Sequence, residues 1–199
     1  MSVEFWDERF AANEYIYGKS PNSYFKSKLD KLNPGKILLP AEGEGRNAVY
    51  AAINGWDVYC FDQSISAMEK AEILASENMV NINYLIADAD EVYYKHDFDV
   101  VVFIFSHFPN HDTLRKISNF TKENGQVIFE CFSKKQIKYQ LEFNSGGPNN
   151  IDLLFSLNDV GKIFRDFEIL ELSEVEVNLN EGNYHNGPAS VIRFNGVKK

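Results

Sequence analysis

Apolar and polar positions alternate along the chain in blocks that predict strands and helices in turn. The apolar blocks are short, as is typical of buried strands, and lie at residues 37–39, 56–61, 82–87, 98–105 and 126–131. Between them, apolar residues spaced three and four apart predict helices at about residues 48–53, 64–75 and 112–121. Strands that alternate with helices form right-handed crossovers and a parallel sheet. The pattern therefore predicts an α/β fold with a ligand at the carboxyl ends of the strands.

Two further helices are predicted before the first strand, at residues 2–13 and 23–32. Ser2 is a candidate N-cap for the first helix, and the Asn-Pro-Gly run at residues 33–35 stops the second. The irregular segment between them carries Tyr15 and Tyr17. These tyrosines either close over a ligand or pack the first helix onto the body of the protein, and the sequence leaves both possibilities open.

The alternation of strands and helices stops before the last third of the chain. A loop, a helix and two strand-like segments are predicted there in turn, at residues 144–150, 158–165, 166–179 and 190–194. Two strands joined by a turn alone are antiparallel, so the sheet is predicted to end in a hairpin. Nothing is left over for a second domain, and we expect residues 1–199 to form one.

Composition and charge narrow the class of protein. A chain of 199 residues with 16 Phe and 10 Tyr can bury one substantial core. Its net charge of −9 argues against a general nucleic-acid binder, which needs a basic face. No signal peptide and no membrane-spanning apolar run is evident, and Cys60 and Cys131 are expected to be buried free thiols. We expect a cytoplasmic monomer or weak homodimer without a metal site, a nucleic-acid partner or a membrane attachment.

A glycine turn follows the first strand and opens a helix. Gly43, Gly45 and the small Ala48 satisfy the G-x-G-x-x-G/A spacing of nucleotide-binding turns. Glycine is required there because a Cβ would block a ligand, or because the turn demands positive φ. An ordinary tight turn between a strand and a helix remains the alternative.

Acidic residues near this turn favour one class of cofactor. Asp62 ends the second strand, 19 positions beyond Gly43, where a carboxylate can accept both hydroxyls of an adenosine ribose. Glu42 and Glu44 would repel a pyrophosphate but suit an ammonium group, and Asp88 can meet an adenine edge. S-adenosylmethionine is therefore favoured over NAD. An NAD-dependent oxidoreductase and a non-catalytic module that binds S-adenosylmethionine remain alternatives.

Six motifs give the chain a specific resemblance that covers nearly all of its length. They are FWDERF at 5–10, YIYGKSPN at 15–22, AEGEGRNAVYAA at 41–52, FDQS at 61–64, SGGP at 145–148 and EGNYHNGPA at 181–189. Together they resemble the class I S-adenosylmethionine-dependent methyltransferases, and more closely the tellurite-resistance-type branch of small bacterial methyltransferases.

The resemblance implies a Rossmann-like fold. The expected sheet has seven mostly parallel strands in the order 3-2-1-4-5-7-6, an antiparallel terminal hairpin and helices on both faces. Residues 1–32 would form a helical cap or lid, residues 33–133 the cofactor-binding core, and residues 134–199 the acceptor-side loops and the hairpin.

The resemblance also implies roles for individual residues at the cofactor. Three residues of the turn would contact its methionine part, four would meet ribose and adenine, and two would border the sulfonium. In that order, they are Glu42, Gly43 and Gly45; Asp62, Gln63, Asp88 and Ala89; and Phe105 and Ser106. The chain departs from the common Asp-x-Gly-x-Gly-x-Gly pattern, with Leu39 in place of the acid and Ala41 in place of the first glycine. We expect Glu42 to supply the missing acid.

Four residues are candidates for work on the acceptor: Tyr17, Arg46, His107 and His185. Tyr17 would exclude water as part of a lid. Arg46 would hold an anionic acceptor or else fix the glycine turn. His107 would act as a base or else be hydrogen-bonded in its loop, and His185 would reach the acceptor or else be exposed at a hairpin tip. A thiolate or a chalcogen oxyanion is already nucleophilic and needs no base, so the acceptor stays open among thiols, such oxyanions and small polar metabolites.

Overall fold

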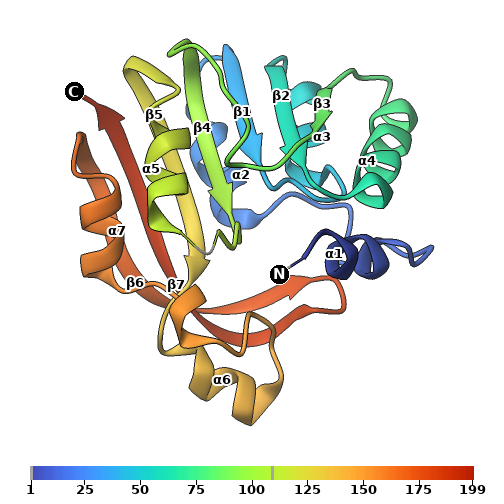
Figure 1. The fold of residues 1–199 in the computed structure, drawn as a ribbon, viewed down its shortest axis with the longest axis vertical. Coiled ribbons are helices and arrows are strands. Elements are labelled where there is room, and N and C mark those ends of the chain that lie inside the picture. The colour runs from blue at the N-terminus through green and yellow to red at the C-terminus, as the bar shows by residue number, and fades with distance from the viewer. Residues whose placement is uncertain (1, 109) are drawn as a thin grey trace.

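The protein forms one mixed sheet with helices on both of its faces. The computed structural model describes residues 2–108 and 110–199, so Met1 and Pro109 lie outside the described residues. Within them the sheet order is β3-β2-β1-β4-β5-β7-β6 (Figure 1). The strands are β1 (Lys36–Pro40), β2 (Asp57–Asp62), β3 (Asn83–Ile86), β4 (Phe98–Ile104), β5 (Thr121–Phe132), β6 (Phe167–Glu181) and β7 (His185–Lys198). β7 pairs antiparallel with both β5 and β6, which confirms the predicted order and the terminal hairpin.

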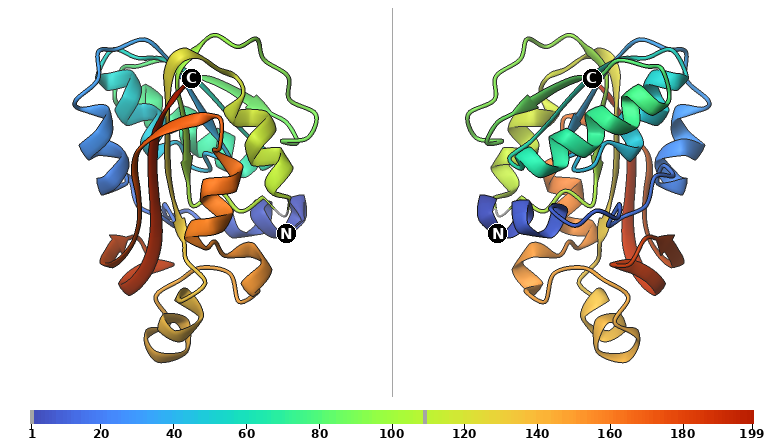
Figure 2. Two further views of the ribbon diagram at one scale, coloured as in Figure 1. Left: turned by 90° about the vertical axis from the view of Figure 1, so that its left-hand side faces the viewer. Right: turned by 90° about the vertical axis from the view of Figure 1, so that its right-hand side faces the viewer.

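Most of the helices form two layers, one on each face of the sheet (Figure 2). Their bounds are α1 (Val3–Phe10), α2 (Ser23–Leu29), α3 (Arg46–Ile53), α4 (Ile65–Glu77), α5 (His111–Ser118), α6 (Gln136–Phe143) and α7 (Leu157–Ile163), with a short 3-10 turn at Ile151–Leu153. One buried cluster joins α5 and α7 to the sheet, and another joins α2 and α3 to it. Among these helices none is long and apolar enough to cross a bilayer.

The central strands explain why two layers form. Neighbouring residues of a strand point to opposite faces, so Leu38 packs in the α5–α7 cluster while Ile37 and Leu39 pack in the α2–α3 cluster. β4 behaves in the same way, with Val101 on one side and Val102 on the other. The nearly continuous apolar run predicted this burial on both faces.

Several helix boundaries differ from those predicted. Ser2 caps α1 through its side chain, as the sequence suggested, and Ser64 caps α4 in the same way. The helix predicted to continue to residue 121 ends at Ser118, and Thr121 already belongs to β5. α6 was not predicted at all. Its Leu141 is 85% exposed, so the helix lacks the continuous apolar stripe by which helices are recognised.

The terminal hairpin is longer than predicted and reaches across the molecule. In Figure 1 the ends of β6 and β7 curve beneath the carboxyl ends of the other strands toward α1. The tip docks on the irregular segment after α1, where the Asn183 N–H donates to the Ile16 carbonyl at 3.0 Å. Gly182 permits the close approach, because a Cβ there would lie 2.2 Å from the Ile16 oxygen. The segment after α1 and the hairpin tip therefore meet at the strand ends where a ligand is expected.

Candidate active site

The turn between β1 and α3 is built from residues with left-handed backbone. Ala41, Gly43 and Gly45 have φ values of 51°, 64° and 84°. Gly45 is also a point of close packing, since a Cβ there would lie 2.6 Å from the Ala71 Cβ. The positive φ given as one reason for glycine at this turn therefore applies to Gly45, and close packing against Ala71 is a further reason. Ala41 adopts a conformation that is unfavourable for a residue with a side chain, at the position where the common pattern has glycine.

Asp62 lies directly beside this turn. Its side chain accepts hydrogen bonds from the Gly43 N–H at 3.1 Å and the Ser64 N–H at 3.1 Å, and the residue is only 8% exposed. Burial raises the pKa of this carboxyl above its usual range, while the two N–H groups oppose the rise. A carboxylate can accept about four hydrogen bonds, so capacity remains for further donors. The arrangement fits a pair of ribose hydroxyls.

The residues expected around adenine lie at the ends of β2 and β3. The Ala87 N–H donates to the Asp62 carbonyl, which places the segment after β3 next to the segment after β2. Asp88 is exposed and accepts the Asp90 N–H at 2.8 Å through Oδ1. Gln63 and Ala89 are half-buried. The fold therefore brings these predicted residues to one edge of the sheet.

Glu42 closes the N-terminus of α3. Its Oε1 accepts the Asn47 and Ala48 N–H groups at 2.8 and 2.7 Å, a task that the N-cap Gly45 cannot perform without a side chain. Burial raises the pKa of Glu42 to about 7, although these N–H groups and Arg46 oppose the rise. Among the described residues Oε2 has no hydrogen-bond partner, so one oxygen can still meet a ligand.

Glu44 points away from the turn, contrary to the expectation that it would meet a ligand's ammonium group. Its carboxylate accepts the Ile16 and Tyr17 N–H groups at 3.1 and 3.3 Å and pairs with Lys70 at 2.6 Å. These bonds hold the segment after α1 against the turn. Glu44 therefore positions the proposed lid, and Glu42 alone remains available to a ligand.

Arg46 links the segment after α1 to the terminal hairpin. Its guanidinium donates to the Tyr17 carbonyl at 3.2 Å and to Glu181 Oε2 at 2.8 Å. Glu181 also accepts Asn22 Nδ2 at 2.9 Å. Burial opposes ionisation of Glu181, yet His185 and Arg46 hold its pKa down to about 2. These partners lie outside the glycine turn, so Arg46 positions the segment after α1 and the hairpin, a role that neither alternative named.

His185 is buried, and the alternative of an exposed hairpin tip is wrong. The residue is 5% exposed because the hairpin folds back under the strand ends. Its ring lies 4.5 Å from the rings of Tyr17 and Phe105 and 5.1 Å from that of Phe132. Burial lowers the pKa of His185, so the imidazole is neutral at pH 7. Its Nδ1 lies 3.7 Å from Glu181 Oε2, beyond ordinary hydrogen-bond length.

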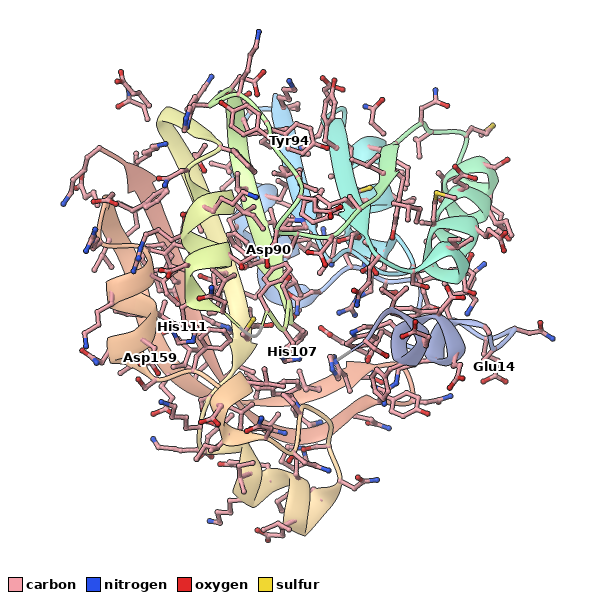
Figure 3. All side chains as sticks on the ribbon, viewed as in Figure 1. Glu14, Asp90, Tyr94, His107, His111 and Asp159 are labelled. Carbon is pink, nitrogen blue, oxygen red and sulfur yellow. The ribbon has the colours of Figure 1, made fainter. Side chains whose placement is uncertain are left out.

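The end of β4 completes this aromatic cluster. Phe105 has a left-handed φ of 50° and packs 4.6 Å from Phe132, while Ser106 Oγ donates to the Pro40 carbonyl at 3.2 Å. His107 stacks on Phe132 with an interplanar angle of 2° and lies just beyond the end of β4 (Figure 3). Burial and the neighbouring His185 lower the pKa of His107 to about 3. At neutral pH such an imidazole accepts hydrogen bonds but holds a proton poorly.

The sequence assigned no role in the site to Phe132 or to Glu181. Phe132 is the last residue of β5, and a fifth strand end at this edge was itself the signal. Glu181 opens the EGNYHNGPA motif and follows a run of alternating acids, which gave it no distinction. Asp7 of α1 was also missed; it accepts Ser64 Oγ at 2.7 Å and the Ser66 N–H at 2.9 Å, and so docks α1 on α4.

Comparison with known proteins agrees with this geometry. Residues 37–125 match a family described as "Methyltransferase domain". The chain is 25% identical over 161 residues to "Probable S-adenosyl-L-methionine-dependent methyltransferase TehB" of Haemophilus influenzae, covering 77% of this chain and 51% of that protein. It is 29% identical over 178 residues to "Ubiquinone biosynthesis O-methyltransferase" of Rickettsia akari, covering 84% and 67%.

The fold comparison covers more of the chain. The crystal structure of TehB from Haemophilus influenzae superposes with a TM-score of 0.72 at 15% identity, over 99% of this chain and 67% of that one. The chain spans about half the length of the full TehB sequence that it matches. The matched residues, the sheet order and these relatives make the chain similar to the class I S-adenosylmethionine-dependent methyltransferases.

Proposed function

We propose that the protein transfers a methyl group from S-adenosylmethionine to a small-molecule acceptor. The observation that carries the proposal is the buried Asp62 carboxylate, which two N–H groups hold beside the glycine turn with capacity for further donors. A bound S-adenosylmethionine would supply an activated methyl group, which passes in line to a nucleophile as neutral S-adenosylhomocysteine leaves. The protein's own task is to place that nucleophile, exclude water and, for a neutral acceptor, accept a proton.

The proposed cofactor site extends along the strand ends. Asp62 would accept the ribose hydroxyls, and Gln63, Asp88 and Ala89 would surround adenine. The methionine part would lie along Gly43 and Gly45, with the free Oε2 of Glu42 toward its ammonium group. Phe105 and Ser106 would border the sulfonium, because they end the neighbouring central strand.

The proposed acceptor site is the aromatic cluster where the segment after α1 meets the hairpin tip. Tyr17, Phe105, Phe132 and the two histidines supply apolar surface that excludes water. His185 is the better candidate for accepting a proton, because the Glu181 carboxylate 3.7 Å away would stabilise the imidazolium. Arg46 would hold Tyr17 and Glu181 in place. Thiols, chalcogen oxyanions and small polar metabolites remain the acceptors to be tested.

Calorimetric titration with S-adenosylmethionine tests the cofactor site. We expect Asp62→Ala to weaken binding by about 2 kcal/mol, because charged hydrogen bonds to ribose are lost. Asp57→Ala is the matched control, since Asp57 is exposed at the opposite end of the same strand, and its affinity should equal that of the wild type. Unchanged affinity in Asp62→Ala would show that the cofactor lies elsewhere.

Transfer itself is tested with methyl-labelled S-adenosylmethionine and a panel of thiols, phenols, carboxylates and chalcogen oxyanions. A labelled product is expected, and His185→Ala should reduce transfer to neutral acceptors more than transfer to thiolates. Tight binding without any labelled product would support the non-catalytic module. Binding of NAD in place of S-adenosylmethionine would overturn the proposal.

A further inference from the structure

Arg9 is the one arginine without an acidic partner among the described residues. The chain has five arginines, and the other four pair with carboxylates: Arg46 with Glu181, Arg115 with Asp112, Arg165 with Asp166 and Arg193 with Glu130. Asp7 lies on the same helix as Arg9, but its carboxylate accepts hydrogen bonds from Ser64 and Ser66. In a chain with a net charge of −9, an unpaired arginine is a notable exception.

The guanidinium of Arg9 is nevertheless held in place by aromatic rings from both ends of the chain. Its Cζ lies 4.6 Å from the Phe5 ring centroid and 5.5 Å from that of Trp6, both in α1. From the hairpin tip, the Tyr184 ring centroid lies 4.6 Å away. Stacking occupies the faces of a guanidinium and leaves its edge, with up to five N–H donors, free for a planar anion.

Arg9 also touches the proposed acceptor site. Its Nη1 donates to Tyr17 Oη at 3.4 Å, and this is its only hydrogen bond to the described part of the protein. Burial raises the pKa of Tyr17, so the phenol stays neutral and does not balance the charge of Arg9. The Tyr17 ring in turn contacts His185, and His185 contacts Phe105 at the end of β4.

We infer that Arg9 is a specificity-determining residue that binds a carboxylate on the methyl acceptor. The inference rests on the proposed function, because it places the acceptor in the cluster beside Phe105. The rings of Tyr17 and His185 lie between Arg9 and Phe105, so the carboxylate and the methylated atom are separate groups of one extended molecule. In a compact oxyanion the charge and the nucleophile lie on the same group, so it cannot reach both Arg9 and the proposed position of methyl transfer beside Phe105. The acceptor class is therefore a small organic acid with a thiol or hydroxyl group at its other end.

Pairs of acceptors that differ only in charge test this inference. The protein, saturated with S-adenosylhomocysteine, is titrated with para-mercaptobenzoate against para-mercaptobenzamide, with para-hydroxybenzoate against para-hydroxybenzamide, and with selenite. Where labelled S-adenosylmethionine gives turnover, kcat and KM are measured for the same pairs. We expect an acid to bind roughly 10- to 100-fold more tightly than its amide, the size of one charge-assisted contact.

Three variants test whether Arg9 causes the preference for an acid over its amide. Arg9→Gln should remove this preference by raising KM for the acid. KM for the amide and the affinity for S-adenosylmethionine should stay unchanged. Arg9→Lys keeps the charge without the planar fork and should retain only part of the preference. Arg165→Gln is the control, because Arg165 is an exposed arginine beyond α7, and it should behave as the wild type.

Two results would overturn the inference: equal binding of acid and amide by the wild type, or a preference that survives in Arg9→Gln. Selenite as the better ligand would assign Arg9 to a compact oxyanion instead and would also overturn it. The wild-type comparison needs no variant to fold. Failure of the proposed function shows separately, as loss of S-adenosylmethionine binding or of all labelled product.

Discussion

The two halves of the candidate site are built in different ways. The proposed cofactor side is made of turns that directly follow β1, β2 and β3, and backbone N–H groups fix its key carboxylates, Glu42 and Asp62. The proposed acceptor side joins the segment after α1 to the hairpin tip, and side chains fix it through the Arg46–Glu181 pair and Asn22. One half depends on local geometry and the other on long-range partners.

Because of this difference, the two halves should differ in how well they tolerate single substitutions. A carboxylate held by backbone N–H groups keeps its position when a neighbouring side chain changes. A surface held by a buried ion pair loses its shape when either partner is removed, because the remaining charge is left in a site of low dielectric. The acceptor side should therefore be the part of the molecule that responds most strongly to single substitutions of polar residues.

Removal of Glu181 should show the largest effect. The Arg46 and Glu181 side chains are 8% and 11% exposed, and Glu181→Ala would leave Arg46 buried without its partner. We expect a loss of about 4 kcal/mol in the free energy of unfolding, measured by urea denaturation. Glu168→Ala is the matched control, since Glu168 is exposed on the same strand, and it should change stability little.

The same variant also tests whether the two halves of the site are independent. If the halves are independent, Glu181→Ala that still folds should bind S-adenosylmethionine normally and lose only acceptor binding. A loss of cofactor affinity as large as the loss of acceptor affinity would show that the halves act as one unit. A stability change below about 1 kcal/mol, the size of an exposed pair, would contradict the buried ion pair.

Gly45→Ala should have the next largest effect and disturbs the cofactor side. A Cβ at this position would meet Ala71 at 2.6 Å, and the φ of 84° disfavours any side chain. Overpacking and backbone strain together should reduce the free energy of unfolding by about 3 kcal/mol. Differential scanning calorimetry or urea denaturation would measure it.

Gly161 of α7 provides the control for Gly45. A Cβ there would lie 3.8 Å from Leu172, an ordinary contact, within a helix where alanine is favoured. Gly161→Ala should therefore be neutral or stabilise by up to about 1 kcal/mol. Equal effects of the two substitutions would show that the tight α3–α4 packing is not what requires glycine in the turn.

The sequence predicted that the ends of the first strands would meet at one edge of the sheet, because that arrangement is set locally. Gly43, Gly45 and Asp62 follow apolar strands directly, and parallel strands bring their carboxyl ends to one edge. The seven-strand order and the hairpin were also predicted, the order through family resemblance. The assignment of Glu44 to a ligand was wrong, because its partners Ile16 and Tyr17 lie 27 or 28 positions away in sequence.

The acceptor side was predicted poorly because its contacts are non-local. A histidine near a hairpin turn is ordinarily exposed, and only the curvature of β6 and β7 buries His185 beside Phe105. Arg46 could be assigned no partner, since Glu181 lies 135 positions away. Pattern and propensity describe neighbours along the chain, and they carry no information about such pairs.

The smallest predicted effect is a pH dependence of stability that arises from titration of Glu42. It tests the proposed cofactor side directly. Its folded-state pKa of about 7 lies above the ordinary value of 4.5, so the protonated carboxyl favours folding. The stabilisation is complete below pH 4.5 and is lost as the pH rises through about 7. Relative to Glu42→Gln, the wild type should therefore lose about 2 kcal/mol of stability between pH 5 and pH 8, as measured by urea denaturation.

Addition of S-adenosylmethionine should weaken this pH dependence if Glu42 faces the ammonium group of the cofactor. A cation at Oε2 would favour the ionised carboxylate, so the pH dependence of the bound protein should flatten in the wild type and stay unchanged in Glu42→Gln. Glu72→Gln, at an exposed position on α4, serves as the control. A pH dependence that S-adenosylmethionine leaves intact would restrict Glu42 to capping α3. The ammonium would then need another partner at this edge of the sheet.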